Sequence, residues 1–299
     1  MATEERVRPD RIYLDRRWSI GIYTGASLFH LTAAQGNVNP VITNESITDV
    51  PADFVADPFM VQRHGIWNMF FEVLNQQTGK GQIGLAISSD GLNWTYQQTV
   101  LREPFHLSYP SIFEWKRDYY MIPETLETKT VRLYKAEEFP IRWSLVSELF
   151  EGSCADPSIF HFDKRWWMFA CSTPYQHKTL RLFFADELTG PWVEHPSSPI
   201  VENDEAKARP AGRVLVLDGE IIRFAQDCTP EYGTRVRAFE ISELTTKTYV
   251  EKEHANSPVL SPNGDGGWNG RRMHHIDAHR LAEGGWIACV DGHGYWEQN

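Results

Sequence analysis

The sequence predicts an all-β fold: a five-bladed β-propeller with four-stranded antiparallel blades, in one domain over residues 1–299. Three observations predict it. A pair of short apolar runs around a polar turn recurs roughly every fifty residues. The first four pairs are each followed by two more strand-like runs, and no helical periodicity interrupts the series. Four strands per unit, repeated along a chain, are typical of a propeller.

The clearest units open with an X-Pro dipeptide and continue through a turn into an aromatic-rich second run. They begin at Asp57-Pro58, Tyr109-Pro110 and Asp156-Pro157, and a looser unit begins at Arg209-Pro210. Since the units follow one another without a linker, we expect one domain. Its first four blades are predicted at about residues 54–100, 105–150, 153–200 and 207–254.

The fifth unit contributes only two strands, at about residues 272–292. Two further strand-like runs lie within residues 17–45. Pairing these segments in one blade closes the ring and removes the open sheet edges that a linear array would leave. The sequence therefore predicts a last blade built from both ends of the chain.

The repeat predicts which distant residues meet. The first strand of each propeller blade lines the central channel, so the starts of these strands gather at one mouth. Asp57, Tyr109, Asp156 and His275 occupy that position. Residues that end the neighbouring strand should face the same mouth, because a hairpin places them beside the first set. The predicted cluster comprises Asp57, Glu72, Glu124, Asp156, Arg209 or Arg213, Gln226, Asp227 and His275.

The carboxylates of this cluster point to chemistry. Glu72 and Glu124 each end an apolar run, where a half-buried carboxylate costs several kcal/mol unless it is paired or functional. Crowded carboxylates push their pKa values apart, which supplies the acid and the base that glycoside hydrolysis needs. An Asp before proline is often a simple turn former. Asp57 and Asp156, in register with two glutamates, favour the functional interpretation.

A second group of polar residues, His274, His275, Asp277 and His279, resembles a metal site. Strand alternation sends the last three to one face, but His279 would then lie deep in the channel. A structural cation near His275 is the alternative that imidazole and carboxylate ligands leave open. We expect hydrogen-bonded histidines instead, with no metal and no cofactor.

Composition excludes several partners. The net charge of −11 and the absence of Lys/Arg clusters argue against nucleic acid. The sequence contains no run of 18 apolar residues, so we expect no membrane span. The acidic N-terminus lacks the apolar core of a signal peptide, and the four cysteines form no CxxC pair, so we expect a cytoplasmic protein with reduced thiols. The oligomeric state stays open.

The blade pattern resembles the five-bladed propeller glycosidases: arabinanases, arabinofuranosidases, xylosidases and invertase-like enzymes. Asp57, in Ala56-Asp57-Pro58-Phe59, matches the catalytic Asp of that superfamily. A closer similarity is to the N-terminal propeller domain of plant glucosamine inositolphosphorylceramide transferases and their bacterial relatives. The segments that carry it include Phe54–Phe59, Phe70–Glu72, His106–Pro110, Tyr120–Glu124, Val131–Ala136, Phe139-Pro140, Gly190–Trp192 and Arg209–Arg213.

The resemblance implies a glycoside hydrolase-like enzyme that cleaves a glycosidic bond, with a furanoside among the candidates, in a carbohydrate or glycoconjugate. Tyr109 and Asp156 stand where arabinanases carry an Asp and a Glu acid, so the acid role passes to Glu124 or Glu72. We expect Asp57 to act as base or nucleophile and Glu124 as general acid. Asp156 and Glu72 would tune pKa values or hold sugar hydroxyls, and Tyr109, Arg213, Asp227 and His275 would orient the sugar.

Two alternatives use the same pocket. One is a glycosyl-transferring or phosphorolytic enzyme in which Arg209 and Arg213 bind phosphate. The other is a carbohydrate-binding propeller without catalysis.

Overall fold

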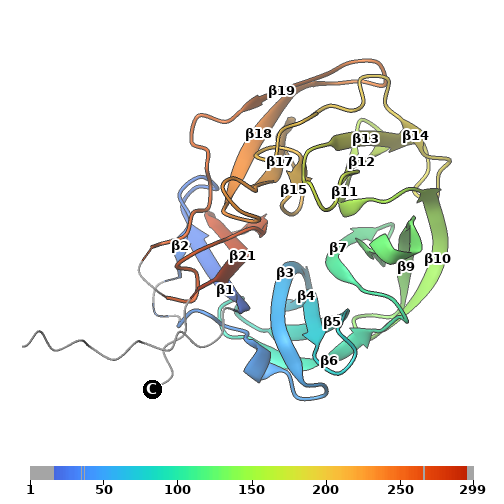
Figure 1. Ribbon diagram of the computed structural model, residues 1–299. Helices are drawn as coiled ribbons and strands as arrows, with labels where there is room; N and C mark the ends of the chain where they lie inside the picture. Colours follow the sequence, from blue (N-terminus) through green and yellow to red (C-terminus); the bar gives the residue numbers. More distant parts are fainter. Residues whose placement is uncertain (1–16, 35, 37, 265–266, 295–299) are drawn as a thin grey trace, which may run out of the picture.

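The computed structural model describes residues 17–34, 36, 38–264 and 267–294. Five antiparallel sheets surround a central axis, as Figure 1 shows. Among the described residues, helical structure is limited to two short 3-10 turns, Asn44–Ser46 and Leu126–Thr128. The predicted five-bladed, all-β propeller is confirmed. The N-terminal stretch on which the localisation was predicted, residues 1–5, lies outside the described residues.

Blades 1 to 3 each contain four consecutive strands, and the first of these lies innermost. Blade 1 contains β3 (Ala52–Arg63), β4 (Ile66–Asn75), β5 (Lys80–Ser88) and β6 (Thr95–Leu101). Blade 2 contains β7 (Ser108–Trp115), β8 (Asp118–Glu124), β9 (Thr130–Glu138) and β10 (Arg142–Glu151). Blade 3 contains β11 (Ala155–Phe162), β12 (Arg165–Cys171), β13 (Leu180–Ala185) and β14 (Val193–Glu194).

Blade 5 closes the ring with strands from both ends of the chain. Its order is β20 (Ile276–Arg280), β21 (Trp286–His293), β1 (Trp18–Gly25) and β2 (Thr32–Ala33). β1 pairs with β21 along its whole length, from Trp18 opposite His293 to Gly25 opposite Trp286. The predicted closure is therefore correct, and it places Trp18 at the end of β21 where the pocket described below opens.

Blade 4 departs from the four-strand pattern because its inner strand is broken. β15 (Arg209–Pro210) and β16 (Leu215–Leu217) both pair with β17 (Glu220–Asp227), which is followed by β18 (Arg235–Leu244) and β19 (Tyr249–Glu253). Gly212 lies in the break with a φ of 131°, and a Cβ there would lie 1.8 Å from the carbonyl oxygen of Ile276. Only glycine fits so close an approach between blades 4 and 5.

The inner strands of blades 1 to 3 share a bulge at the X-Pro dipeptide. Asp57, Tyr109 and Asp156 all adopt left-handed backbone, with φ of 53°, 46° and 52°. The strand register shifts at each of these positions. Left-handed backbone at a non-glycine residue costs about 1–3 kcal/mol. The repeated bulge turns the residue before proline out of the regular ladder at the channel mouth.

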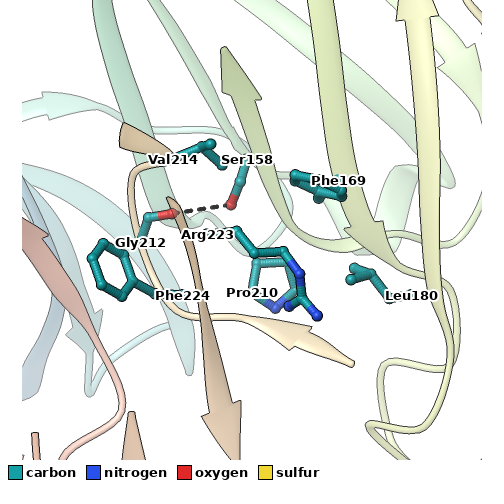
Figure 2. Close-up of a pocket in the computed structure, with 8 residues that line it drawn as sticks. All are labelled: Ser158, Phe169, Leu180, Pro210, Gly212, Val214, Arg223 and Phe224. Atoms are coloured by element: carbon teal, nitrogen blue, oxygen red, sulfur yellow. Dashed lines mark hydrogen bonds between the residues drawn. The ribbon is translucent and has the colours of Figure 1, made fainter. Parts of the chain in front are cut away.

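Apolar clusters fill each interface between neighbouring blades. Between blades 5 and 1, for example, Ile22 and Cys289 pack with Met69 and Phe71. Between blades 3 and 4, Figure 2 shows Phe169 beside Arg223, and the small gap there has no volume for a water. Arg223 is buried and pairs with Glu251 at 2.5 Å. No helix of the described part of the chain has the length and apolarity to cross a membrane.

Candidate active site

A polar cavity of about 210 Å³ opens at the channel mouth where the strand starts converge. Its walls come from four of the five blades and carry three carboxylates. The lining residues are Trp18, Phe54, Ala56, Asp57, Glu72, His106, Ser108, Glu124, Arg209, Tyr232 and His274. Of the cluster predicted from the repeat, the lining contains Asp57, Glu72, Glu124 and Arg209.

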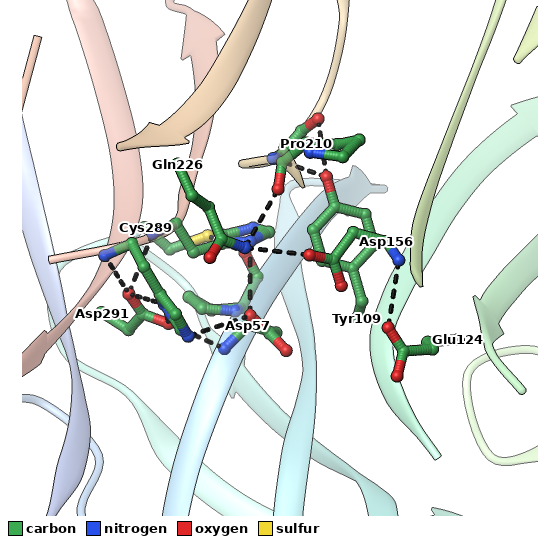
Figure 3. A network of polar contacts seen from close by, with 12 residues as sticks. Asp57, Tyr109, Glu124, Asp156, Pro210, Gln226, Cys289 and Asp291 are labelled. Atoms are coloured by element: carbon green, nitrogen blue, oxygen red, sulfur yellow. Dashed lines mark hydrogen bonds and ion pairs between the residues drawn. The ribbon is translucent and has the colours of Figure 1, made fainter. Parts of the chain in front are cut away.

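Asp156 lies beside the cavity, outside its lining, at the centre of a charge network; Figure 3 shows its contacts with Gln226 and Glu124. Arg209 donates to it through Nε at 2.6 Å and through Nη2 at 3.3 Å. Gln226 donates from Nε2 at 2.9 Å. Arg209 is further held by the carbonyl oxygen of Pro174 and by Nδ1 of His177, at 3.0 and 3.1 Å. The guanidinium is therefore fully engaged by the protein itself.

Glu124 lies beside this network and is set up to be an acid. Its Oε2 accepts the Asp156 backbone N–H at 3.1 Å, and Arg209 Nη2 lies 3.6 Å from the same oxygen. Burial, and next the charge of Asp156, raise the pKa of Glu124 to about 8 despite the guanidinium. A carboxyl with this pKa holds its proton at neutral pH.

Asp57 occupies the other side of the cavity. Its backbone N–H donates to Asp291 Oδ2 at 3.0 Å. Its own Oδ1 has no hydrogen-bond partner, with His275 Nδ1 at 3.7 Å and His274 Nε2 at 3.9 Å. Burial raises the pKa of Asp57 well above its ordinary range, and the negative charges of Asp156, Asp291 and Glu72 add to this effect.

Glu72 is paired with a histidine that the sequence argument did not place in the site. His106 Nε2 lies 3.0 Å from Glu72 Oε1, while its Nδ1 accepts the Gly81 N–H at 3.0 Å. Burial lowers the pKa of His106, but the hydrogen bond and charge of Glu72 outweigh burial, so the net shift is upward. Glu72 thus has a partner that can neutralise it.

Tyr109 and His275 lie next to the cavity without lining it. The Tyr109 hydroxyl contacts Ser158 Oγ at 2.7 Å and donates to the Gly212 carbonyl at 3.0 Å, which joins blades 2, 3 and 4. His275 is fully buried, its two ring nitrogens have no partner, and burial lowers its pKa to about 4. Tyr109 therefore links three blades around the channel, and His275 lies next to Asp57 as a neutral ring.

Two further predicted members, Arg213 and Asp227, lie away from the cavity. Arg213 follows the break in blade 4 and reaches across the channel to Asp277 at 2.6 Å and to the Ile112 carbonyl at 2.9 Å. Asp227 follows Gln226 on β17, so strand alternation turns it to the other face, where Arg237 pairs with it at 2.7 Å. The prediction that Arg213 and Asp227 belong to the cluster at the channel mouth is therefore wrong.

The functional side chains that the sequence did not predict for this site are Trp18, His106, Tyr232 and His274 in the lining, and Asp291, which contacts Asp57 and His274 from outside the lining. Asp291 carried a usable signal, since it ends the apolar run of β21 as Glu72 ends that of β4. His106 and Tyr232 lie in loops outside the repeated strand positions, so the repeat could not predict where they lie.

Among the described residues, Asp57, His274 and Asp291 offer ligand atoms within 4.8 Å of one another. The oxygens of Asp291 already accept the backbone N–H groups of Asp57, His274 and His275 and contact His274 Nδ1. Asp57 Oδ1 and His274 Nε2 are the atoms left for a cation. This donor set fits a hydrogen-bonded acid–imidazole pair better than a metal site.

Comparison with known proteins decides the family. The profile of "Glucosamine inositolphosphorylceramide transferase 1, N-terminal" matches residues 13–293. The chain belongs to this family. The curated protein of that name from Oryza sativa subsp. japonica is 36% identical over 295 residues, covering 92% of this chain and 40% of the rice protein. The Arabidopsis thaliana protein is 34% identical, with 92% and 39% covered. The chain thus spans about two fifths of the length of these relatives.

Solved structures with the same fold include glycoside hydrolases. The catalytic domain of the Coprinopsis cinerea GH62 alpha-L-arabinofuranosidase matches with a TM-score of 0.63 and 11% identity, over 92% of this chain and 97% of that one. A putative glycoside hydrolase from Parabacteroides distasonis matches with a TM-score of 0.62 and 11% identity, over 89% and 98%. At this identity the likeness concerns the fold, so this family has a glycoside hydrolase-like propeller.

Proposed function

We propose that this protein cleaves a glycosidic bond by carboxylate acid/base catalysis in the cavity, with Glu124 as general acid and Asp57 as base or nucleophile. One observation carries the proposal. Two buried carboxyls, both with pKa values above the ordinary range, face one sugar-sized cavity from adjacent blades. Such pairs are the machinery of glycoside hydrolysis.

In the hydrolytic reaction the bond between the anomeric carbon and the leaving oxygen breaks. Glu124 gives its proton to that oxygen, and a water that bonds to the anomeric carbon gives a proton to the Asp57 carboxylate when Asp57 acts as base. As a nucleophile, Asp57 would first bond to the carbon itself. Asp156 supports the acid, because its charge raises the pKa of Glu124 and its ion pair holds Arg209 beside it.

The substrate we propose is a carbohydrate or glycoconjugate. The family relatives are named glucosamine inositolphosphorylceramide transferase, whereas structures with this fold include an arabinofuranosidase and a beta-xylosidase.

Glycosyl transfer is the second candidate, and the relatives' name favours it. An acceptor hydroxyl would take the place of water and deliver its proton to Asp57. Phosphorolysis has less support, because Arg209 is engaged by Asp156, Pro174 and His177 and Arg213 by Asp277. Binding without catalysis would leave the raised carboxyl pKa values without a role.

A panel of 4-nitrophenyl furanosides and pyranosides, assayed with and without acceptor alcohols, tests the proposal. Asp57→Asn and Glu124→Gln should each lower turnover by about 10²–10⁴-fold, the usual contribution of acid or base catalysis. Binding of the sugar product should persist. Glu148→Gln, on exposed strand β10, is the control. If both site variants kept wild-type turnover, the assignment of Asp57 and Glu124 as catalytic residues would be wrong.

A further inference from the structure

We infer that His274, oriented by Asp291, is the proton acceptor for Asp57. The imidazole takes the proton of the Asp57 carboxyl and leaves a carboxylate ready to act on the substrate. The inference rests on the proposed function and adds a third proton-transferring residue to the cavity. It starts from a pair of residues, Asp291 and His274, that neither the repeat nor the family likeness singles out.

The orientation of the imidazole follows from the contacts of Asp291. His274 Nδ1 lies 2.8 Å from Asp291 Oδ1 and 2.7 Å from Oδ2. A ring nitrogen facing a carboxylate carries the proton, so the neutral ring leaves Nε2 with a free lone pair. The presence of His274 in the pocket lining and the 3.9 Å separation from Asp57 Oδ1 place that lone pair beside the acid.

The ring is clamped in this position from three sides. The indole of Trp18 stacks on it with centroids 3.9 Å apart and planes at 14°. The ring of Tyr232 meets it edge-on at 5.2 Å and 88°. Gly233, with a φ of 67°, passes so close that a Cβ would lie 2.7 Å from the Cβ of His274. These contacts fix the plane of the His274 ring, and Asp291 fixes its tautomer. A histidine that only filled space would need neither.

Asp291 also fixes the other partner. The oxygen that accepts the Asp57 N–H at 3.0 Å belongs to the same carboxylate that holds the imidazole. Asp57 and His274 therefore share one anchor, which sets their separation. The ring nitrogens nearest to Asp57 Oδ1 are His275 Nδ1 at 3.7 Å and His274 Nε2 at 3.9 Å, and of these two rings only that of His274 lines the cavity. The transfer that we infer requires the carboxyl to rotate about its soft terminal torsion until Oδ1 is within hydrogen-bond reach of Nε2.

The surrounding charges favour the transfer. Asp57 faces the carboxylates of Asp156, Asp291 and Glu72, with Arg209 as the opposing cation. These negative charges resist ionisation of Asp57 alone, but they stabilise an imidazolium formed beside it. On the side of His274 the titratable neighbours are Asp291, His275 and Tyr232, and Arg272 lies over the outer ring of Trp18 at 5.7 Å.

The step balances without any further reagent. The O–H bond of the Asp57 carboxyl breaks and an N–H bond forms at His274 Nε2, giving a carboxylate and an imidazolium. When the carboxylate later takes a proton from the attacking water, that proton leaves to solvent as Glu124 takes a new one. No electron transfer is involved. Asp57 and Glu124, which both favour their protonated forms, are thereby differentiated into a base and an acid.

Substitution of His274 by asparagine distinguishes the role of Nδ1 from that of Nε2. In His274→Asn the amide can still donate to Asp291, as Nδ1 does, but nothing replaces Nε2. We expect kcat to fall by about 100-fold on whichever 4-nitrophenyl glycoside the wild-type enzyme turns over, with little change in KM. The acid side of the rate profile should also move to higher pH, because nothing in the variant takes the proton of the Asp57 carboxyl. His64→Asn, in the exposed turn after β3, is the matched control. Unchanged kcat and pH profile would overturn the inference.

A second measurement depends neither on turnover nor on the folding of His274→Asn. Long-range ¹⁵N–¹H spectra of the wild-type imidazoles should show His274 protonated on Nδ1 at neutral pH, with an Nε2 resonance that shifts in Asp57→Asn. An Nε2–H tautomer, or an Nε2 signal that ignores Asp57, would contradict the inference. If no glycoside is cleaved while the tautomer is as expected, the proposed function fails and the proton-sharing pair stands.

Discussion

At the scale of single residues, the site works by keeping carboxyl groups out of water and close to one another. Glu124 illustrates this: burial and the neighbouring Asp156 together raise its pKa to about 8, although Arg209 lies 3.6 Å away. The guanidinium is shared with Asp156, to which it binds more closely at 2.6 Å. Asp156 thus takes most of the neutralisation, and Glu124 is left as the acid.

This assignment has a consequence for stability. Because the folded-state pKa of Glu124 lies above the ordinary 4.5, folding favours its protonated form. That contribution is complete below about pH 4.5 and is lost as the pH rises through about 8. Glu124→Gln removes the ionisation and keeps an oxygen to accept the Asp156 N–H.

We therefore expect wild type and Glu124→Gln to have similar free energies of unfolding at pH 5. At pH 9 the variant should be more stable by more than about 1 kcal/mol, since each pKa unit is worth about 1.4 kcal/mol. Urea titrations at both pH values measure this, with Glu148→Gln as the control. A stability difference that does not change with pH would contradict the raised pKa.

At the scale of strands, the sequence predicted what the repeat governs and missed what breaks it. Asp57 and Arg209, which precede prolines, and the carboxylates of Glu72 on β4 and Glu124 on β8 line one cavity, as the repeat predicted. Asp227 was misplaced because it follows Gln226 on β17 and so faces the other side of the strand. Arg213 was misplaced because the inner strand of blade 4 stops after Pro210 and resumes at Leu215. Nothing in the local pattern distinguishes that break from a regular strand except a single glycine.

Gly212 is the residue on which the break depends. Gly212→Ala would drive a Cβ into the Ile276 carbonyl, whereas Gly219, also at positive φ, has open space around it. We expect Gly212→Ala to destabilise the fold by about 3 kcal/mol or more, from overpacking added to backbone strain. Gly219→Ala should cost only the strain, about 1–2 kcal/mol. Equal unfolding free energies for the two variants in urea would refute this role for Gly212.

At the scale of the whole molecule, the ring is what makes the site. Glu124 comes from blade 2, Asp57 from blade 1, Arg209 from blade 4, and Asp291 and His274 from the segments that form blade 5. No sheet alone holds an acid and a base. The sequence could predict this convergence from topology, but the pairing of Asp291 with His274 depends on side-chain directions that a repeat of strand positions does not contain.

The claim that most needs testing is that Glu124 protonates the leaving group. It is tested by kcat/KM of wild type and Glu124→Gln on one glycone carrying leaving groups of different acidity. A methyl or alkyl glycoside needs the proton, so Glu124→Gln should lose about 10²–10⁴-fold there. A 2,4-dinitrophenyl glycoside leaves without it, and the loss should be below about tenfold. An equal loss on both substrates would show that Glu124 is not the acid.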